Sequence, residues 1–226
     1  VTPEEHKARA VSLVLFGGIF SGILGPGIAF LTKDWVEGAP FMGSYQSLIG
    51  LYILVFLLLH LVDLPKPTAS EQQPRTRPFW DIMRQTSWKI SVFSAALGYA
   101  AMALIMTATP LSMQAHHHAF SASAFVIQWH VIAMFLPSFF TGNLIQRFGR
   151  KNIMLMGIGL NLLCILINTQ GQFFLSYWSA LILLGVGWNF MFIAGTTLLT
   201  ETYRPEEKAL VQLSLIHISE PTRLST

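Results

Sequence analysis

The chain has 226 residues, of which 53% are hydrophobic and only 11% charged, and its mean hydropathy is +0.54. Soluble domains carry about 25% charged residues, so the composition excludes an ordinary soluble protein. The net charge of +3 does not indicate a nucleic-acid partner, because the basic residues are spread over several short polar segments and do not form one basic face. Cys164 stands alone within an apolar run, which excludes a disulfide within the chain.

Six apolar segments with few charges predict an all-α membrane protein, because a helix needs about 20 such residues to cross a bilayer. They cover residues 10–31, 43–62, 90–110, 122–144, 153–168 and 173–200. The fifth is short for a bilayer, and we expect it to extend into its flanks. The polar residues before the first segment do not form a cleavable signal peptide.

The basic residues predict the orientation of these segments. Twelve of the 14 Lys and Arg residues lie on one side of the membrane, Lys33 alone lies on the other, and Arg223 lies in the tail. Loops rich in Lys and Arg remain in the cytoplasm. We therefore expect a multi-pass protein of the bacterial cytoplasmic membrane with both chain ends in the cytoplasm.

The first apolar segment carries a ladder of small residues that ends in Gly-Pro-Gly. Small side chains let helix backbones approach closely, and Pro26 removes one backbone donor and can kink the helix. Ordinary helix packing is one interpretation of this pattern. The members of the ladder are Gly17, Gly18, Ser21, Gly22, Gly25, Pro26 and Gly27.

Residues 64–88 have the composition of a linker, with four prolines among Gln, Ser and Arg. The end of this stretch, Phe79 to Trp88, predicts a short interfacial helix. In that helix Phe79, Trp80, Ile82 and Met83 would meet lipid, and Arg84 would meet the headgroups.

A short basic loop, Gly142 to Lys151, joins the fourth and fifth segments and predicts a hairpin of membrane helices. Its sequence, GNLIQRFGRK, resembles the characteristic loop of the major facilitator superfamily, Gly-x-Leu-x-Asp-Arg-x-Gly-Arg-(Arg/Lys). Gln146 stands where that family usually has Asp. The matching positions are Gly142, Leu144, Arg147, Gly149, Arg150 and Lys151.

The resemblance implies a place for the chain in a twelve-helix fold, as helices five to ten. Residues 1–63 would end the first half, 64–88 would be the cytoplasmic linker, and 89–212 would begin the second half. Residues 3–10, PEEHKARA, are echoed by residues 205–211, PEEKALV, which fits two related halves, with a chance match as the alternative. The ladder resembles the antiporter motif of the family's fifth helix. The matching residues are Gly18, Ser21, Gly22, Gly25, Pro26 and Gly27.

The two ends of the chain are expected to be artificial. The start at Val1 has the character of a truncation, because four helices of the family would lie upstream. Residues 213–226 are excluded from the fold, since Ser214 to Arg223 resembles a translated sequencing adapter.

The polar residues within the membrane supply the candidate site. Gln128 and His130, on either side of Trp129, form the closest cluster of polar residues within an apolar segment. Trp188 and Asn189 lie at a comparable depth. Since the resembled family places helices seven, eight and ten around its central cavity, these residues and Tyr99 with Met102 could meet a substrate. Gln128 and His130 are about 200° apart around a helix, so only one of them can face the cavity.

Each candidate has a plainer alternative. The pKa range of His130 suits proton coupling, although a membrane histidine can simply bridge two helices. Asn189 and Trp188 could equally serve packing. His116, His117 and His118 suggest zinc or copper, but consecutive residues rarely supply three ligands to one tetrahedral ion, so we interpret them as a polar loop and expect no metal.

The resemblance implies a secondary active transporter of a small organic solute that works by alternating access and is proton-coupled, with a lean to export from the antiport-like ladder. A non-transporting receptor or a membrane-embedded enzyme is the alternative. An enzyme would need paired acids, clustered histidines or a nucleophile at one depth, and no such set is seen. The expected partners are the solute, the lipid bilayer and protons, with no cofactor and no nucleic acid.

Overall fold

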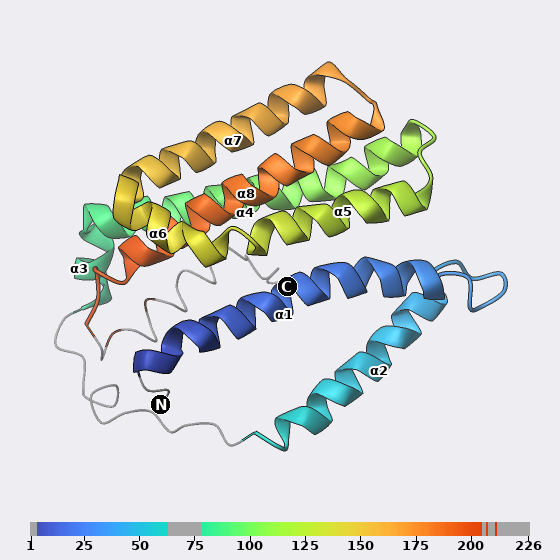
Figure 1. The fold of residues 1–226 in the computed structure, drawn as a ribbon, viewed down its shortest axis with the longest axis horizontal. Helices are drawn as coiled ribbons and strands as arrows, with labels where there is room; N and C mark the ends of the chain where they lie inside the picture. Colours follow the sequence, from blue (N-terminus) through green and yellow to red (C-terminus); the bar gives the residue numbers. More distant parts are fainter. Residues whose placement is uncertain (1–3, 63–77, 205–206, 208–210, 212–226) are drawn as a thin grey trace.

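The computed structural model describes residues 4–62, 78–204, 207 and 211, and side chains from Gly17 onward. The described elements are helices, as expected where a backbone has to satisfy its own polar groups within the bilayer. They are α1 (Glu4–Thr32), α2 (Met42–Leu59), α3 (Phe79–Arg84), α4 (Thr86–Ala115), α5 (Phe120–Phe135), α6 (Ser138–Phe148), α7 (Arg150–Gln170) and α8 (Phe174–Leu199). Figure 1 shows α4 to α8 as a bundle, with α1 and α2 as a hairpin beside α5.

The described helices confirm the predicted all-α membrane fold. Helices α2, α4, α7 and α8 are each long and apolar enough to cross a membrane, and α5 with α6 passes the same test as a bent pair. Helix α1 has 29 residues, of which Gly17–Thr32 forms its described apolar part. Helix α7 has 21 residues, or about 30 Å, so the fifth predicted segment does extend into its flanks.

The fourth predicted segment, residues 122–144, is not one straight helix. Helix α5 ends at Phe135 and α6 begins at Ser138, with a bend of 45° between them. Pro137 lies at the break and has no N–H group to continue the helical hydrogen-bond ladder. The prediction of a single span therefore missed a bend, although the apolar run itself is continuous.

The predicted basic loop, Gly142 to Lys151, is largely helical. Helix α6 runs to Phe148 and α7 begins at Arg150, so Gly149 alone joins them. Its φ of 81° lies in the left-handed region that favours glycine. The predicted hairpin is present, but its turn is a single residue.

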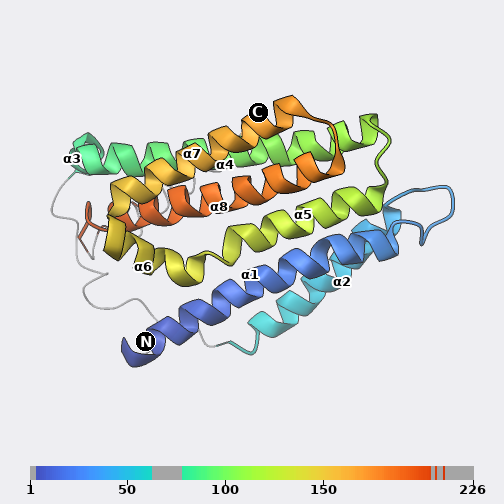
Figure 2. The same cartoon turned by 45° about the horizontal axis from the view of Figure 1, so that its top comes forward.

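Helix α8 lies at the centre of the bundle and contacts α4, α5, α6 and α7. The rotated view in Figure 2 shows it between α4 and α5 and close to α7. Among the described elements, α2 contacts only α1, and nearly all of its apolar side chains are exposed. The folded core of this chain is therefore the bundle α4–α8.

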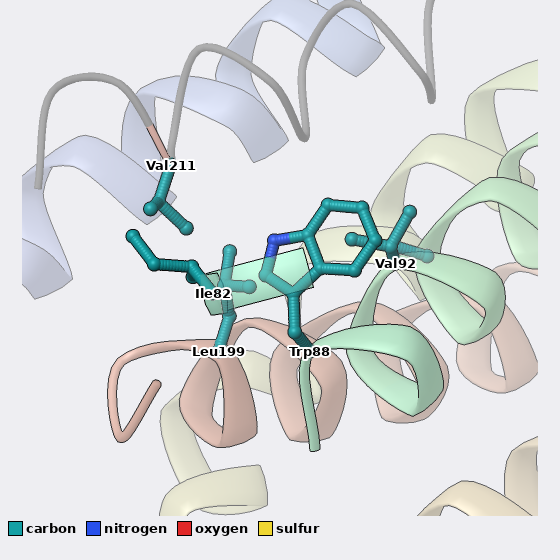
Figure 3. Close-up of a cluster of buried hydrophobic side chains, with 6 residues drawn as sticks. Ile82, Trp88, Val92, Leu199 and Val211 are labelled. Carbon is teal, nitrogen blue, oxygen red and sulfur yellow. The ribbon is translucent and has the colours of Figure 1, made fainter. Parts of the chain in front are cut away.

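The short helix α3 packs against the bundle with one face. Ile82 is only 1% exposed and lies with Trp88, Leu199 and Val211 in the cluster of Figure 3. The expectation that Ile82 meets lipid is therefore wrong, because the ends of α4 and α8 offer it an apolar surface. Trp80 keeps 68% of its surface exposed, as an interfacial side chain would.

Several predictions concern residues outside the described part of the chain. Of the linker at 64–88, the structure describes only residues 78–88. Of the echo at residues 3–10 and 205–211, the structure describes the backbone of residues 4–10 and, in the second copy, residues 207 and 211. The whole tail at 213–226 lies outside the described residues.

Candidate functional site at the crossing of α5 and α8

Helices α5 and α8 approach one another closely at Gly185. A Cβ atom built on Gly185 would lie 2.7 Å from the carbonyl oxygen of His130 and 2.9 Å from Cβ of Ala133. A larger residue would push the two backbones apart, which is the usual reason for glycine at a membrane helix crossing. Leu181, Gly185 and Asn189 follow one another at intervals of four and share one face of α8.

His130 joins α5 to this face of α8. Its side chain is 0% exposed, and Nδ1 lies 2.8 Å from the carbonyl oxygen of Leu181. The other ring nitrogen, Nε2, is buried and has no hydrogen-bond partner among the described residues.

Asn189 bonds to the bend between α5 and α6. Its Nδ2 donates to the carbonyl oxygen of Met134 at 2.6 Å and lies 2.5 Å from Oγ of Ser138. Its Oδ1 accepts from Oγ1 of Thr141 at 2.7 Å, and that hydroxyl is also 2.8 Å from the carbonyl oxygen of Pro137. The amide therefore satisfies polar groups on both sides of the break.

Gln128 points away from α8 and towards α1. Its Nε2 donates to the carbonyl oxygen of Ile23 at 3.0 Å. Gln128 and His130 thus contact different helices, as their spacing of two residues requires.

The remaining candidates lie elsewhere on the bundle. The ring of Trp188 stacks on Phe192 at a centroid distance of 4.7 Å, while Met102 is 8% exposed and Tyr99 is half-buried on α4. Four cavities of about 400 to 690 Å³ lie on the described part of the chain, and none of these four is lined by any of the six candidate residues. The structure brings His130 and Asn189 onto one helix crossing but does not bring the six residues around one cavity.

Part of the small-residue ladder of α1 meets α5. A Cβ atom on Gly22 would lie 2.7 Å from Cβ of Val131, and one on Gly18 would lie 2.8 Å from the ring of Phe135. A Cβ on Gly25 would meet nothing within 4 Å. Ser21 bonds back to the carbonyl oxygen of Gly18 at 2.8 Å, as serines in membrane helices often do.

The motif at residues 142–151 joins three helix ends. Arg150 forms an ion pair with Glu201, which links the start of α7 to the segment after α8. Leu144 packs against a buried cluster that includes Ile153 and Phe190. Four other residues of the motif are exposed on the surface: Gly142, Gln146, Arg147 and Lys151.

Two of the three loop histidines, His116 and His118, form side-chain hydrogen bonds with the protein around them. Nδ1 of His116 lies 2.7 Å from the carbonyl oxygen of Ser112, and Nε2 of His118 lies 3.0 Å from that of Gln172. Within the described part of the chain, no three His, Cys, Asp or Glu residues are grouped to hold a metal ion.

Sequence reasoning missed two groups of residues. Ser138 and Thr141 complete the contacts of Asn189. Two hydroxyl residues within four positions after a membrane proline are a signal that could have revealed them, because such groups re-satisfy freed backbone. The second group joins α1, the loop after it and α5: Phe120 stacks with Phe30 at 6.3 Å, and Nζ of Lys33 lies 5.7 Å from both ring centres. No local pattern marks that cluster, since its members come from segments far apart in the chain.

Long apolar helices that are tied together by buried amide, imidazole and hydroxyl contacts define a multi-pass α-helical membrane protein. The family model of the Major Facilitator Superfamily matches residues 1–215, and the chain belongs to that family. The family resemblance of the Gly142 motif is thereby confirmed.

The chain is similar to three curated relatives. It is 40% identical over 212 residues to the riboflavin transporter RfnT of Brucella anthropi, a match that covers 92% of this chain and 53% of the relative. It is 30% and 28% identical to YdeG and YddS of Bacillus subtilis, two uncharacterized MFS-type transporters, over 92% of this chain and 52% of each relative. The chain spans about half the length of the curated relatives it matches, and no solved structure matches it.

Proposed function

We propose that this chain forms about half of a secondary active transporter that carries a small organic solute by alternating access. The observation that carries this proposal is the 40% identity to a riboflavin transporter over 92% of the chain. Riboflavin or a related planar heteroaromatic compound is therefore the first solute to test.

The proposal assigns the parts of the chain to two halves. Residues 1–63 end the first half, 64–88 form the linker, and 89–212 begin the second half. Under this assignment, α1 and α5 form a contact between the halves, through the close approach of Gly22 to Val131 and the hydrogen bond from Gln128 to Ile23. Movement of the halves would break and remake contacts of this kind.

Proton-linked export is the finer part of the proposal, and it rests on the antiport-like ladder of α1. Close packing of α1 on α5 limits leakage of protons through the interface when no solute is bound. The proton would enter the cell as the solute leaves.

Everted membrane vesicles from cells that contain the full-length protein test the direction. Riboflavin should accumulate in them when a proton gradient, acid inside, is imposed. Accumulation in intact cells that collapses with an uncoupler would show uptake and overturn export. Absence of riboflavin movement in both preparations would overturn the choice of solute.

A further inference from the structure

His130 lies at the depth where secondary transporters bind their coupling ions. It is ten residues from the start of α5, or about 15 Å along the helix axis. The hydrocarbon core of a bilayer is about 30 Å thick, so a span that enters this core at the start of α5 carries the imidazole near the midplane. Coupling-ion sites of secondary transporters lie near that plane.

The hydrogen bond of His130 identifies which ring nitrogen is free. The carbonyl oxygen of Leu181 only accepts, so Nδ1 of His130 carries the proton in their 2.8 Å contact. In the neutral ring Nε2 then holds a lone pair and no proton. That atom is buried and has no partner among the described residues.

We propose that Nε2 of His130 is the proton-binding site that couples solute transport to the proton gradient. The inference rests on the proposed proton-coupled function and names the group that would perform it. A proton from water binds the lone pair of Nε2 and turns the ring into a cation. When this proton returns to water, the ring becomes neutral again.

The packing of His130 explains how the proton would drive a conformational change. A buried cation with an unpartnered N–H group is costly, so the protonated ring disfavours the packing seen here. The proton therefore binds in a conformation in which Nε2 is open to water. A ligand that prefers one of two conformations shifts the equilibrium between them, which is the requirement for coupling.

No carboxylate competes with His130 within the described spans. Helices α2, α4, α5, α6, α7 and α8 contain no Asp or Glu, and the same holds for residues 17–32 of α1. Other titratable groups lie on or beside the helices that pack against α5. Among the described residues, the His130 ring forms no hydrogen bond with any of them. These groups include Lys33, Asp34 and Glu37 after α1, Lys89 and Tyr99 on α4, His116, His117 and His118 after α4, Arg147 on α6, Arg150 after α6, Tyr177 on α8 and Glu201 after α8.

The test uses a substitution that keeps the bond and removes the titratable atom. His130→Asn places an amide N–H near the position of Nδ1, so the donor to Leu181 remains while Nε2 is lost. His60→Asn is the matched control, because His60 also bonds a backbone carbonyl oxygen, that of Phe56 at 2.8 Å, but is exposed. His130→Gln serves as a second variant in case the first fails to fold.

Each full-length variant is placed in liposomes, and two rates of radiolabelled riboflavin movement are measured. His130→Asn should lose gradient-driven accumulation by about tenfold or more, within the usual range of coupling energies, and should keep gradient-free exchange at nearly the wild-type rate. The control should retain both rates. Solute-induced pH changes outside the liposomes should disappear only in the His130 variants.

Two results would overturn the proton site while leaving the proposed function standing. One is normal accumulation by both His130 variants. The other is that both variants lose exchange as well as accumulation, which would show that His130 serves packing. A wild-type protein that exchanges riboflavin but never responds to a proton gradient would instead overturn proton coupling itself.

Discussion

At the residue scale, Asn189 shows how one side chain can stabilise a bent membrane span. The break at Pro137 frees backbone groups that lipid cannot satisfy. Nδ2 of Asn189 reaches the carbonyl oxygen of Met134 on one side of the break, and Oδ1 accepts from Thr141 on the other. These contacts support the packing alternative for Asn189, and we expect replacement of Asn189 to lower the stability of the protein.

Asn189→Ala should lower the thermal stability of the full-length protein, because it leaves buried polar groups at the bend without partners. Hydrogen bonds in membrane bundles contribute roughly 0.6 to 1.7 kcal/mol each, so the expected loss is about 1–3 kcal/mol. Asn168→Ala is the control, since Nδ2 of Asn168 only approaches Sγ of Cys164 at 3.6 Å. Thermal unfolding in detergent measures both, and equal midpoints would contradict the role assigned to Asn189.

The sequence identified His130, Asn189 and Gln128 as candidates because polar residues are rare in membrane spans. It did not identify their partners. The rotation of each helix, and which neighbour it meets, depend on packing between segments that are far apart in the chain. The convergence of six residues on one cavity was for that reason an expectation from the family and could not be worked out from spacing.

At the element scale, the contact between α1 and α5 depends on which side of the glycine ladder faces the partner. Gly18 and Gly22 lie against α5, whereas Gly25 faces open space among the described residues. The pattern of small residues predicted close packing but not its direction, because glycines occur all round this helix.

Gly22→Leu should separate α1 from α5 and impair transport by the full-length protein. Its side chain would overlap Val131, whose Cβ lies 2.7 Å from the position of a new Cβ. Gly25→Leu makes the same chemical change where a Cβ meets nothing within 4 Å. The two variants are compared by their initial rates of riboflavin movement at matched expression. A larger defect in Gly25→Leu would show that Gly25 faces a partner beyond this chain.

Helix α3 connects the linker to the bundle through Ile82. Ile82→Ala should weaken this attachment by about 2–4 kcal/mol, as expected for a buried isoleucine. Trypsin should then cut faster after Arg84, which lies at the end of α3. Trp80→Ala, at a side chain 68% exposed, should leave the cleavage rate unchanged, and equal cleavage in the two variants would show that α3 is not held by Ile82.

At the scale of the whole molecule, the apolar segments and the family motif predicted the fold class, because the length of an apolar segment and a short motif can both be identified from local sequence. The bend at Pro137 and the one-residue turn at Gly149 were missed. An apolar run continues through both helices of a bent span, and a basic stretch can be helical when one glycine supplies the turn. The burial of Ile82 was missed because it depends on Leu199, more than a hundred residues away.

The orientation remains a prediction from the distribution of Lys and Arg. Reporter fusions after Pro40, Gln114 and Gln170 should report an external location. Fusions after Ser70 and Gly149 should report the cytoplasm. Reversal of any two of these five locations would contradict the topology.

The central claim is that α1 and α5 belong to two parts that move against each other during transport. Phe30 and Phe120 stack at one end of this contact, so cysteines at these two positions can be bridged by a short bifunctional thiol reagent in a Cys164→Ala background. Rates of riboflavin movement are then measured in the full-length protein before and after cross-linking, with each single-cysteine variant treated in the same way. The bridge should stop transport, and reduction of a reducible bridge should restore it. Undiminished transport by fully cross-linked protein would contradict it.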